Sequence, residues 1–240
     1  MIELYQDGAE LEAMKRAYAS GNVQGFTTNP TLMRKAGITD YAAFARAAIA
    51  AIPDLPISFE VFSDDFPTME REARIIRSWG GNTYVKIPIT NTRGESAIPL
   101  IARLSAEGFS LNVTAILTLD QVEAVAAAVN PQASTIVSVF AGRIADTGCD
   151  PVPVMTRAAE ILKPLPNAKL LWASPREVLN VLQAQDCGCH IITATPDILA
   201  KMSLFGKDLT QFSLETVRMF YEDARKAGYN LVEQDVLTVA

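Results

Sequence analysis

Short apolar segments alternate with longer amphipathic ones along most of the 240-residue chain, and this alternation restricts the fold more than any other feature. The apolar segments are rich in Val, Ile, Leu or Phe, as is typical of parallel strands buried on both faces. The expected strands are Ile2–Gln6, Val23–Phe26, Ile57–Phe62, Thr83–Ile87, Ser110–Thr114, Thr135–Phe140, Lys169–Ala173 and His190–Thr193. Eight strands that each precede a helical stretch predict a single (β/α)8 TIM barrel, an α/β fold of typically about 250 residues.

The intervening segments have helical composition, and several of them begin with proline, which the first turn of a helix tolerates. The expected helices are Ala9–Ala19, Asp40–Ala51, Phe66–Trp79, Glu95–Glu107, Leu119–Val129, Pro151–Leu162, Pro175–Gln185, Pro196–Met202 and Leu214–Ala227. An open doubly wound sheet is the alternative, although no G-x-G-x-x-G turn follows the first strand. Because no linker divides the chain, we expect one catalytic barrel domain over residues 1–228 and a tail over residues 229–240.

Charge and composition narrow the class of protein. The formal net charge is −6, and no basic run or stripe appears, which argues against nucleic acid as a partner. No apolar run approaches the roughly 18 residues of a membrane span. Three cysteines are too few for a disulfide scaffold, so a reducing compartment is expected. The sequence therefore predicts a soluble cytoplasmic protein that does not contact a membrane.

Polar side chains stand at the ends of the expected strands. In a TIM barrel the active site lies at the carboxyl ends of the strands, and alternate strand residues face inward. The candidates in chain order are Asp7, Thr27, Thr28, Asn29, Glu60, Lys86, Asn112, Thr114, Ser138, Phe140, Arg143, Trp172, Ser174 and Arg176. Their shared position predicts a common site at the mouth of the barrel.

Lys86 is the most informative of them, because its strand neighbours are apolar and a buried cation is costly. Burial favours the neutral amine, which is a nucleophile and can form a Schiff base. Asp7 and Glu60 could then serve as an acid/base pair. The alternatives are a lysine that extends into solvent, or a Glu60 that only neutralises it. The other polar strand ends at matching depth favour catalysis.

Arg143 and Arg176 suggest an anion clamp. They follow the sixth and seventh expected strands, where TIM barrels often bind phosphate, and Ser138 and Ser174 precede them. Two guanidinium groups and a hydroxyl suit a phosphate monoester. Two surface ion pairs are the alternative interpretation.

Cys187, Cys189 and His190 form a Cys-x-Cys-His sequence that lacks the second ligand pair of a zinc site. We interpret the thiols as buried and reduced, and we expect no metal site.

Five segments of the chain resemble the transaldolase family, a group of class I aldolases, and the resemblance extends from about Ile2 to Ala227. The segments are Gly25–Leu32, Val85–Pro88, Leu111–Thr114, Ser138–Arg143 and Trp172–Arg176. The Thr-Thr-Asn-Pro sequence together with the lysine strand at this spacing is specific. The resemblance implies a TIM barrel that works without a cofactor.

The resemblance also implies a role for each matching residue. Lys86 would form a Schiff base with a ketose phosphate, and Asp7 would take the hydroxyl proton as the C3–C4 bond breaks. Glu60 and Thr114 would hold a catalytic water. Substrate-binding residues would be Asn29, Thr28, Asn112, Ser138, Phe140, Arg143, Ser174 and Arg176. Asn29 and Asn112 would orient the three-carbon unit, and Arg143, Ser174 and Arg176 would hold the phosphate.

Two positions distinguish reactions within this family. Fructose-6-phosphate aldolases, which release free dihydroxyacetone, tend to carry Gln and Tyr where this chain has Glu60 and Phe140. The resemblance thus favours a transaldolase that passes the dihydroxyacetone unit to an aldose phosphate. A lysine-dependent aldolase and a non-catalytic phosphosugar-binding barrel remain as alternatives. Gly8 and Pro175 depart from residues frequent in the family, which bears on donor and acceptor preference.

Short members of the family assemble as pentamers or decamers through the C-terminal helix. The resemblance therefore implies a homo-oligomer, with the expected helix Leu214–Ala227 as the contact.

Overall fold

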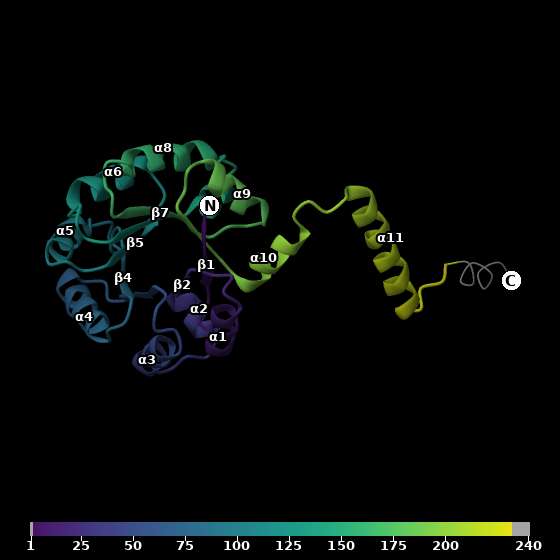
Figure 1. The fold of residues 1–240 in the computed structure, drawn as a ribbon, viewed down its shortest axis with the longest axis horizontal. Coiled ribbons are helices and arrows are strands. Elements are labelled where there is room, and N and C mark those ends of the chain that lie inside the picture. Colours follow the sequence, from purple (N-terminus) through teal and green to yellow (C-terminus); the bar gives the residue numbers. More distant parts are fainter. Residues whose placement is uncertain (1, 232–240) are drawn as a thin grey trace. The chain divides into compact units, whose positions relative to one another are not determined.

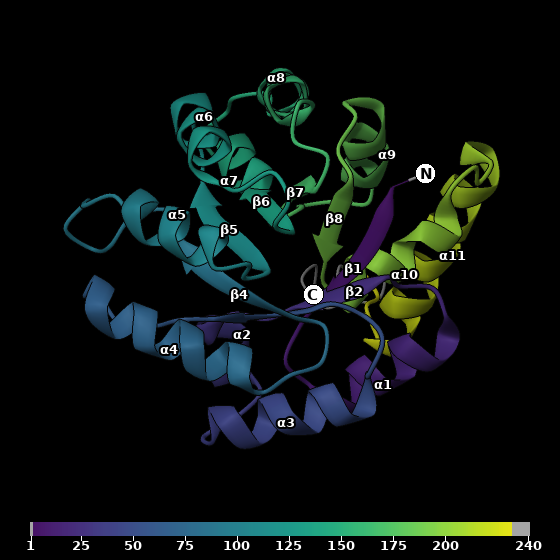
Figure 2. The ribbon, with the colours of Figure 1, turned by 60° about the vertical axis from the view of Figure 1, so that its left-hand side comes forward.

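The computed structural model describes residues 2–231, and its core is a closed barrel of eight strands in sequence order. All neighbouring strands pair in parallel, and β1 closes the barrel between β2 and β8 (Figure 2). The strands are β1 (Glu3–Asp7), β2 (Gly25–Thr27), β3 (Ile57–Glu60), β4 (Thr83–Pro88), β5 (Leu111–Ile116), β6 (Thr135–Val139), β7 (Ala168–Trp172) and β8 (Ile191–Ala194). The TIM barrel is confirmed, and the open doubly wound sheet is wrong.

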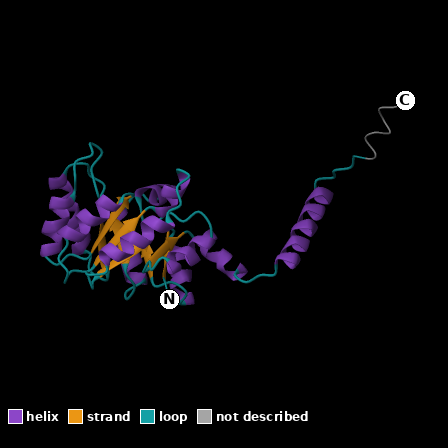
Figure 3. Ribbon diagram, turned by 90° about the horizontal axis from the view of Figure 1, so that it is seen from above, coloured by secondary structure: helices purple, strands orange, loops and turns teal. Residues whose placement is uncertain are grey.

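Helices lie around the outside of the strands (Figures 1 and 3). They are α1 (Leu11–Ser20), α2 (Pro30–Lys35), α3 (Tyr41–Ala51), α4 (Phe66–Ser78), α5 (Ile98–Ala106), α6 (Leu119–Ala128), α7 (Ala141–Asp146), α8 (Val152–Leu162), α9 (Leu179–Asp186) and α10 (Pro196–Ala200). The sequence did not predict α2 and α7. Each has only six residues, which is too short for an apolar period to show.

Side-chain caps fix where several of these helices begin. Asp40, Asp65 and Thr118 each accept a backbone N–H from the third residue after them, at the start of α3, α4 and α6. At Thr118 the bond is reciprocal, because Gln121 reaches back to the cap and completes a capping box. These caps satisfy amide groups that a helix start leaves without partners.

An apolar floor fills the interior of the barrel beneath the strand ends. Tyr5, Ile136, Leu171, Ala173 and Ile191 form one buried cluster. A Cβ at Gly25 would lie 2.5 Å from the Tyr5 ring, so glycine makes room for that ring inside the barrel. The floor supports the polar residues one or two positions further along the strands.

The chain divides into two compact units, Met1–Ala200 and Lys201–Ala240. The first contains the barrel, and the second contains a 3-10 helix, η1 (Lys201–Leu204), and the helix α11 (Leu209–Lys226). The latter begins five residues before the expected start, because Asp208 caps it. The expected tail lies, from residue 232 on, outside the described residues. Within residues 2–231, no helix is long and apolar enough to cross a membrane.

Candidate active site

Lys86 lies inside the barrel, in register with Glu60 on β3 and Asn112 on β5. Its residue is 6% exposed, so the side chain does not extend into solvent. The Nζ atom lies 3.0 Å from Glu60 Oε2 and donates a hydrogen bond of 3.1 Å to the carbonyl of Thr28. A single carboxylate and one carbonyl thus hold the amine near the mouth of the barrel.

Asp7 ends β1 and faces the same interior. Its Oδ1 accepts a hydrogen bond of 2.8 Å from Thr27 Oγ1. The loss of solvent around the carboxyl raises the pKa of Asp7 above its ordinary value, and the Lys86 charge and the Thr27 hydroxyl partly oppose this effect. A carboxyl with a raised pKa can both take up and return a proton, as a general acid/base must.

A buried chain of polar groups braces the strands next to Lys86. Asn112 Nδ2 donates to Ser58 Oγ at 3.0 Å, and Ser138 Oγ donates to Asn112 Oδ1 at 2.6 Å. Thr28 Oγ1 donates to the carbonyl of Ser58 at 2.9 Å. Because both are fully buried and neither lines the cavity, Thr28 and Asn112 lie behind the wall of the site.

Thr114 is placed differently, because the residue lines the cavity. Its Oγ1 is buried and has no hydrogen-bond partner within the described residues. Immediately after it, β5 changes register between Val113 and Ile116, and Ala115 has a φ of 61°. A positive φ is unusual for alanine, and such backbone strain is concentrated at functional sites.

The cavity at the mouth has a volume of about 700 Å³. It is large enough for a phosphorylated sugar, since small-molecule sites span about 300–1,000 Å³. Ten of the twelve residues to which the family resemblance assigns a role line it: Asp7, Asn29, Glu60, Lys86, Thr114, Ser138, Phe140, Arg143, Ser174 and Arg176. Three basic side chains and two acidic ones line this cavity, although the whole chain is acidic.

Asn29, which lines the cavity, also caps a helix. Its side chain accepts the N–H of Leu32 at 3.0 Å and thereby caps α2, while Pro30 occupies the first turn. The cap fixes the direction in which the chain leaves β2.

The two arginines follow β6 and β7 at the mouth of the barrel. The Arg143 guanidinium stacks 5.5 Å from the centre of the Phe140 ring, and Arg176 forms an ion pair with Asp146 at the end of α7. Arg176 also donates to the carbonyl of Gly142 at 3.4 Å. Both guanidinium groups are therefore oriented by the chain, and both remain exposed to the cavity.

Gly142 permits the loops after β6 and β7 to approach closely. Its N–H donates to the carbonyl of Ala173 at 3.2 Å, and a Cβ at this position would lie 1.5 Å from the carbonyl oxygen of Ser174. Ser174 itself has a φ of 56°. The side of the mouth that carries Arg143 and Arg176 thus depends on one glycine contact and one strained serine.

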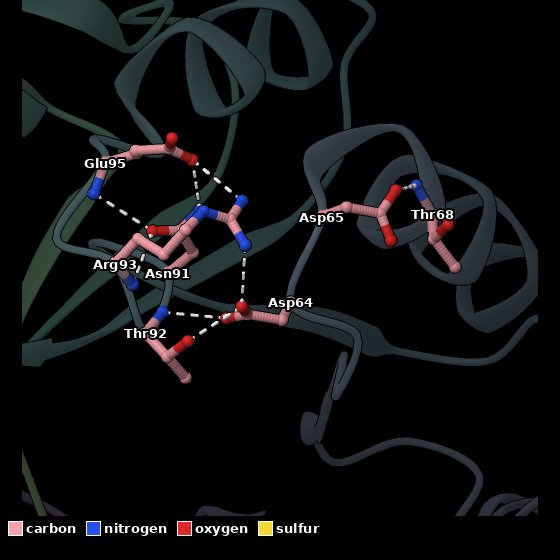
Figure 4. Close-up of polar contacts among 7 residues, drawn as sticks. All are labelled: Asp64, Asp65, Thr68, Asn91, Thr92, Arg93 and Glu95. Atoms are coloured by element: carbon pink, nitrogen blue, oxygen red, sulfur yellow. Dashed lines mark hydrogen bonds and ion pairs between the residues drawn. The ribbon is translucent and has the colours of Figure 1, made fainter.

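The rim beyond β3 and β4 is held by ion pairs and backbone contacts (Figure 4). Asp64 accepts hydrogen bonds of 2.7 Å from the N–H and the hydroxyl of Thr92, and it pairs with Arg93 at 3.1 Å. Asp65 instead caps α4 through Thr68. These aspartates belong to the structure of the loops, and no group of three or more potential metal ligands occurs in the described part of the chain.

Several residues that line the cavity were not predicted from the sequence. Thr193, Thr195 and Ile198, on β8 and in the segment after it, line the cavity. Trp172 does not line it, although it was grouped with Ser174 as a strand-end candidate. It alternates with Leu171 and Ala173, which face inward, so its ring packs outside the barrel.

Cys187 and Cys189 are buried free thiols, and His190 accepts the N–H of Leu170 at 3.1 Å. These residues lie at the opposite end of β7 and β8 from the cavity.

The chain is similar in sequence and in fold to known proteins. Residues 4–235 match the family described as transaldolase/fructose-6-phosphate aldolase. A probable transaldolase of Thermoanaerobacter sp. (strain X514) is 35% identical over 96% of this chain and 100% of its own length. One from Dehalococcoides mccartyi is 32% identical over 84% of this chain and 90% of its own.

A crystal structure of a putative dihydrodipicolinate synthase family protein from Coccidioides immitis superposes with a TM-score of 0.58 at 18% identity, covering 95% of this chain and 75% of that one. This likeness concerns the fold alone.

Fold and site together define an α/β-barrel protein with a buried lysine–carboxylate pair at its mouth. The chain belongs to the transaldolase/fructose-6-phosphate aldolase family.

Proposed function

We propose that this protein is a transaldolase-type transferase, which moves a dihydroxyacetone unit from a ketose phosphate to an aldose phosphate through a Schiff base on Lys86. The observation that carries the proposal is the position of the Lys86 amine. It is buried 3.0 Å from Glu60, in one cavity with Asp7 and two arginines. Family membership supports the same chemistry.

In the proposed reaction, the Lys86 ammonium first passes a proton to Glu60, 3.0 Å away. The amine then adds to the C2 carbonyl of the ketose, and water leaves as the iminium forms. In the proposal, Glu60 and Thr114 hold the water that carries protons in this step; both residues line the cavity, and the buried Thr114 hydroxyl has no partner within the described residues. Asp7 then takes the C4 hydroxyl proton as the C3–C4 bond breaks, and the electron pair of that bond enters the enamine.

The second half of the reaction reverses these steps on a new aldehyde. The enamine carbon attacks the acceptor carbonyl, Asp7 returns its proton to the new alkoxide, and water releases the product from Lys86. The sequence of steps balances without a redox or metal cofactor.

Phosphorylated sugars are the proposed substrates, because Arg143, Ser174 and Arg176 lie together on one wall. Guanidinium groups bind phosphate oxygens with directed, charge-assisted hydrogen bonds.

A sugar long enough to span from these groups to Lys86 would place its carbonyl at the amine. This arrangement would account for specificity toward ketoses that carry a terminal phosphate.

An aldolase that releases dihydroxyacetone is the second candidate. We favour transfer because Glu60 can relay protons through water and because Phe140 presents no hydroxyl to the cavity. Incubating the protein with fructose 6-phosphate, with and without an aldose phosphate acceptor, separates the two reactions. Transfer requires the acceptor, whereas an aldolase forms free dihydroxyacetone without it.

Borohydride trapping tests the imine directly. A ketose phosphate and borohydride should give a stable adduct whose mass maps to Lys86, and Lys86→Ala should abolish both the adduct and turnover. Arg176→Ala should mainly raise KM for phosphorylated substrates. Binding without any adduct would favour a non-catalytic phosphosugar-binding barrel, and near-normal turnover by Lys86→Ala would exclude the imine.

We further propose a cytoplasmic homo-oligomer, a pentamer or a decamer. In α11 no residue is buried, and several large apolar side chains are exposed, among them Phe220 at 63% and Val217 at 59%. Exposed apolar surface of this kind commonly marks a protein interface. Light scattering after size-exclusion chromatography should give several times the 26.0 kDa chain mass, and Phe220→Glu should lower it.

A further inference from the structure

Two buried threonines connect β8 and β2 to the Asp7 carboxylate. Thr27 and Thr193 are 2% and 5% exposed, and they lie on the two strands that flank β1. Thr27 Oγ1 lies 2.8 Å from Asp7 Oδ1 and 2.5 Å from Thr193 Oγ1. Both threonines line the same cavity as Lys86.

The two hydrogen bonds between Thr193, Thr27 and Asp7 run in one direction, because each hydroxyl has only one proton to donate. A threonine hydroxyl has one proton to donate and two lone pairs to accept with. Because Thr27 gives its proton to Asp7, the short contact between the hydroxyls requires Thr193 to donate to Thr27. The chain therefore runs from Thr193 through Thr27 to the carboxylate, and each bond polarises the next.

We propose that Thr193 is a positioning residue for carbon–carbon cleavage, which acts through Thr27 to keep the Asp7 carboxylate oriented as the base. The inference rests on the proposed function, in which Asp7 takes the hydroxyl proton of the substrate. Asp7 Oδ1 is occupied by Thr27, whereas Oδ2 has no hydrogen-bond partner among residues 2–231. The chain of hydroxyls thus leaves Oδ2 as the oxygen that meets the substrate.

The charged groups that act on Asp7 are Lys86, which favours its ionised form, and Glu60, which disfavours it. Thr193 carries no charge and has no other hydrogen-bond partner in the described part of the chain. Its influence on Asp7 must therefore pass through the Thr27 hydroxyl, and a valine of similar shape would remove that influence while filling the space.

The test is the pH dependence of single-turnover cleavage of a ketose phosphate, together with borohydride trapping at Lys86. Asp7 acts in its ionised form, so the rate falls below its pKa. Losing a hydrogen bond that favours this form should move the acid limb to higher pH. We expect a shift of about 0.5 unit for Thr193→Val and of about 1 to 2 units for Thr27→Val, where the direct bond is lost.

Matched variants separate positioning from packing. Thr193→Ser retains the hydroxyl and should restore the acid limb of the wild-type pH profile. Thr135→Val removes a buried hydroxyl at the start of β6 that has no partner among the described residues, and it should leave the limb unchanged. Trapping at Lys86 should persist in all of these variants.

The outcomes also distinguish this inference from the proposed function. If wild-type protein gives no adduct at Lys86, the proposed function fails. If the adduct forms and Thr193→Val keeps the wild-type limb, or Thr193→Ser fails to restore a shifted limb, the role of Thr193 is overturned. Should Thr193→Val not fold, Thr193→Ala provides the same comparison, since it also lacks the hydroxyl.

Discussion

Gly142→Ala tests whether the close contact between the loops after β6 and β7 sets the position of Arg176 at the mouth of the barrel. The added Cβ would lie 1.5 Å from the carbonyl oxygen of Ser174, whereas real Cβ contacts stay beyond 3.0 Å. The carbonyl must therefore retreat by about 1.5 Å, since backbone has no rotamer that could relieve the overlap. The hydrogen bond from the Gly142 N–H to Ala173, now 3.2 Å, would be broken.

The expected cost combines overpacking of about 2 kcal/mol with one backbone hydrogen bond of about 1 kcal/mol. For a chain of this size, such a loss should lower Tm by about 6 to 12 °C in a thermal melt. Moving Ser174 also displaces Arg176, so KM for a ketose phosphate should rise by about tenfold or more.

Gly8→Ala is the matched control for stability. A Cβ there would meet only the Gln6 side chain, at 4.0 Å, and Gly8 does not have a positive φ. Its Tm should stay near that of the wild type. Imine trapping with unphosphorylated dihydroxyacetone should persist in Gly142→Ala, because that ligand does not need Arg176. A Gly142→Ala protein that melts within 2 °C of the wild type and keeps its KM would refute the reasoning.

Three further substitutions test other features. Asp7→Asn should raise Tm at neutral pH, because burial raises the pKa of Asp7 and its ionised form costs folding energy above that pKa. The difference in Tm between Asp7→Asn and the wild type should narrow as the pH falls and the native Asp7 becomes protonated. Thermal melts across a pH series measure this difference. Asp146→Asn should lower KM for phosphorylated ketoses by about two- to five-fold, since it frees Arg176 from an exposed ion pair; steady-state kinetics at low salt measure this. Thr135→Val should raise the free energy of unfolding by about 0.5 to 1 kcal/mol in a urea titration, because the buried hydroxyl has no partner in the described residues.

The strands of the barrel could be predicted because each is buried on both faces and therefore apolar in sequence. Lys86 stood out for the same reason, as a cation in an apolar strand. Helices α2 and α7 could not be predicted, because a six-residue helix shows less than two turns of any pattern. The cap of α2, Asn29, lies in a segment whose polar residues equally suggest a loop.

The missing parts of the site depend on contacts that sequence spacing does not contain. Thr193 meets Thr27 across 166 positions, and nothing in its neighbours Ile192 and Ala194 indicates a polar partner. The positive φ of Ala115 is likewise invisible, because alanine carries no signal for a left-handed turn. Only closure of the barrel between β1 and β8 brings Thr193 close to Thr27.

Strained backbone and buried charge gather at the mouth of the barrel. Ala115 and Ser174 have positive φ values, the carboxyl of Asp7 is partly desolvated, and Lys86 and Glu60 form a pair that is rarely a net gain when buried. The apolar floor around Tyr5 has no such features, so its burial must offset the free-energy cost of the residues at the mouth. Substitutions in the floor should therefore change folding more than chemistry, and those at the mouth should do the reverse. Gly142 is the exception, because a substitution there should change both folding and chemistry. One added atom strains the backbone and also moves Arg176.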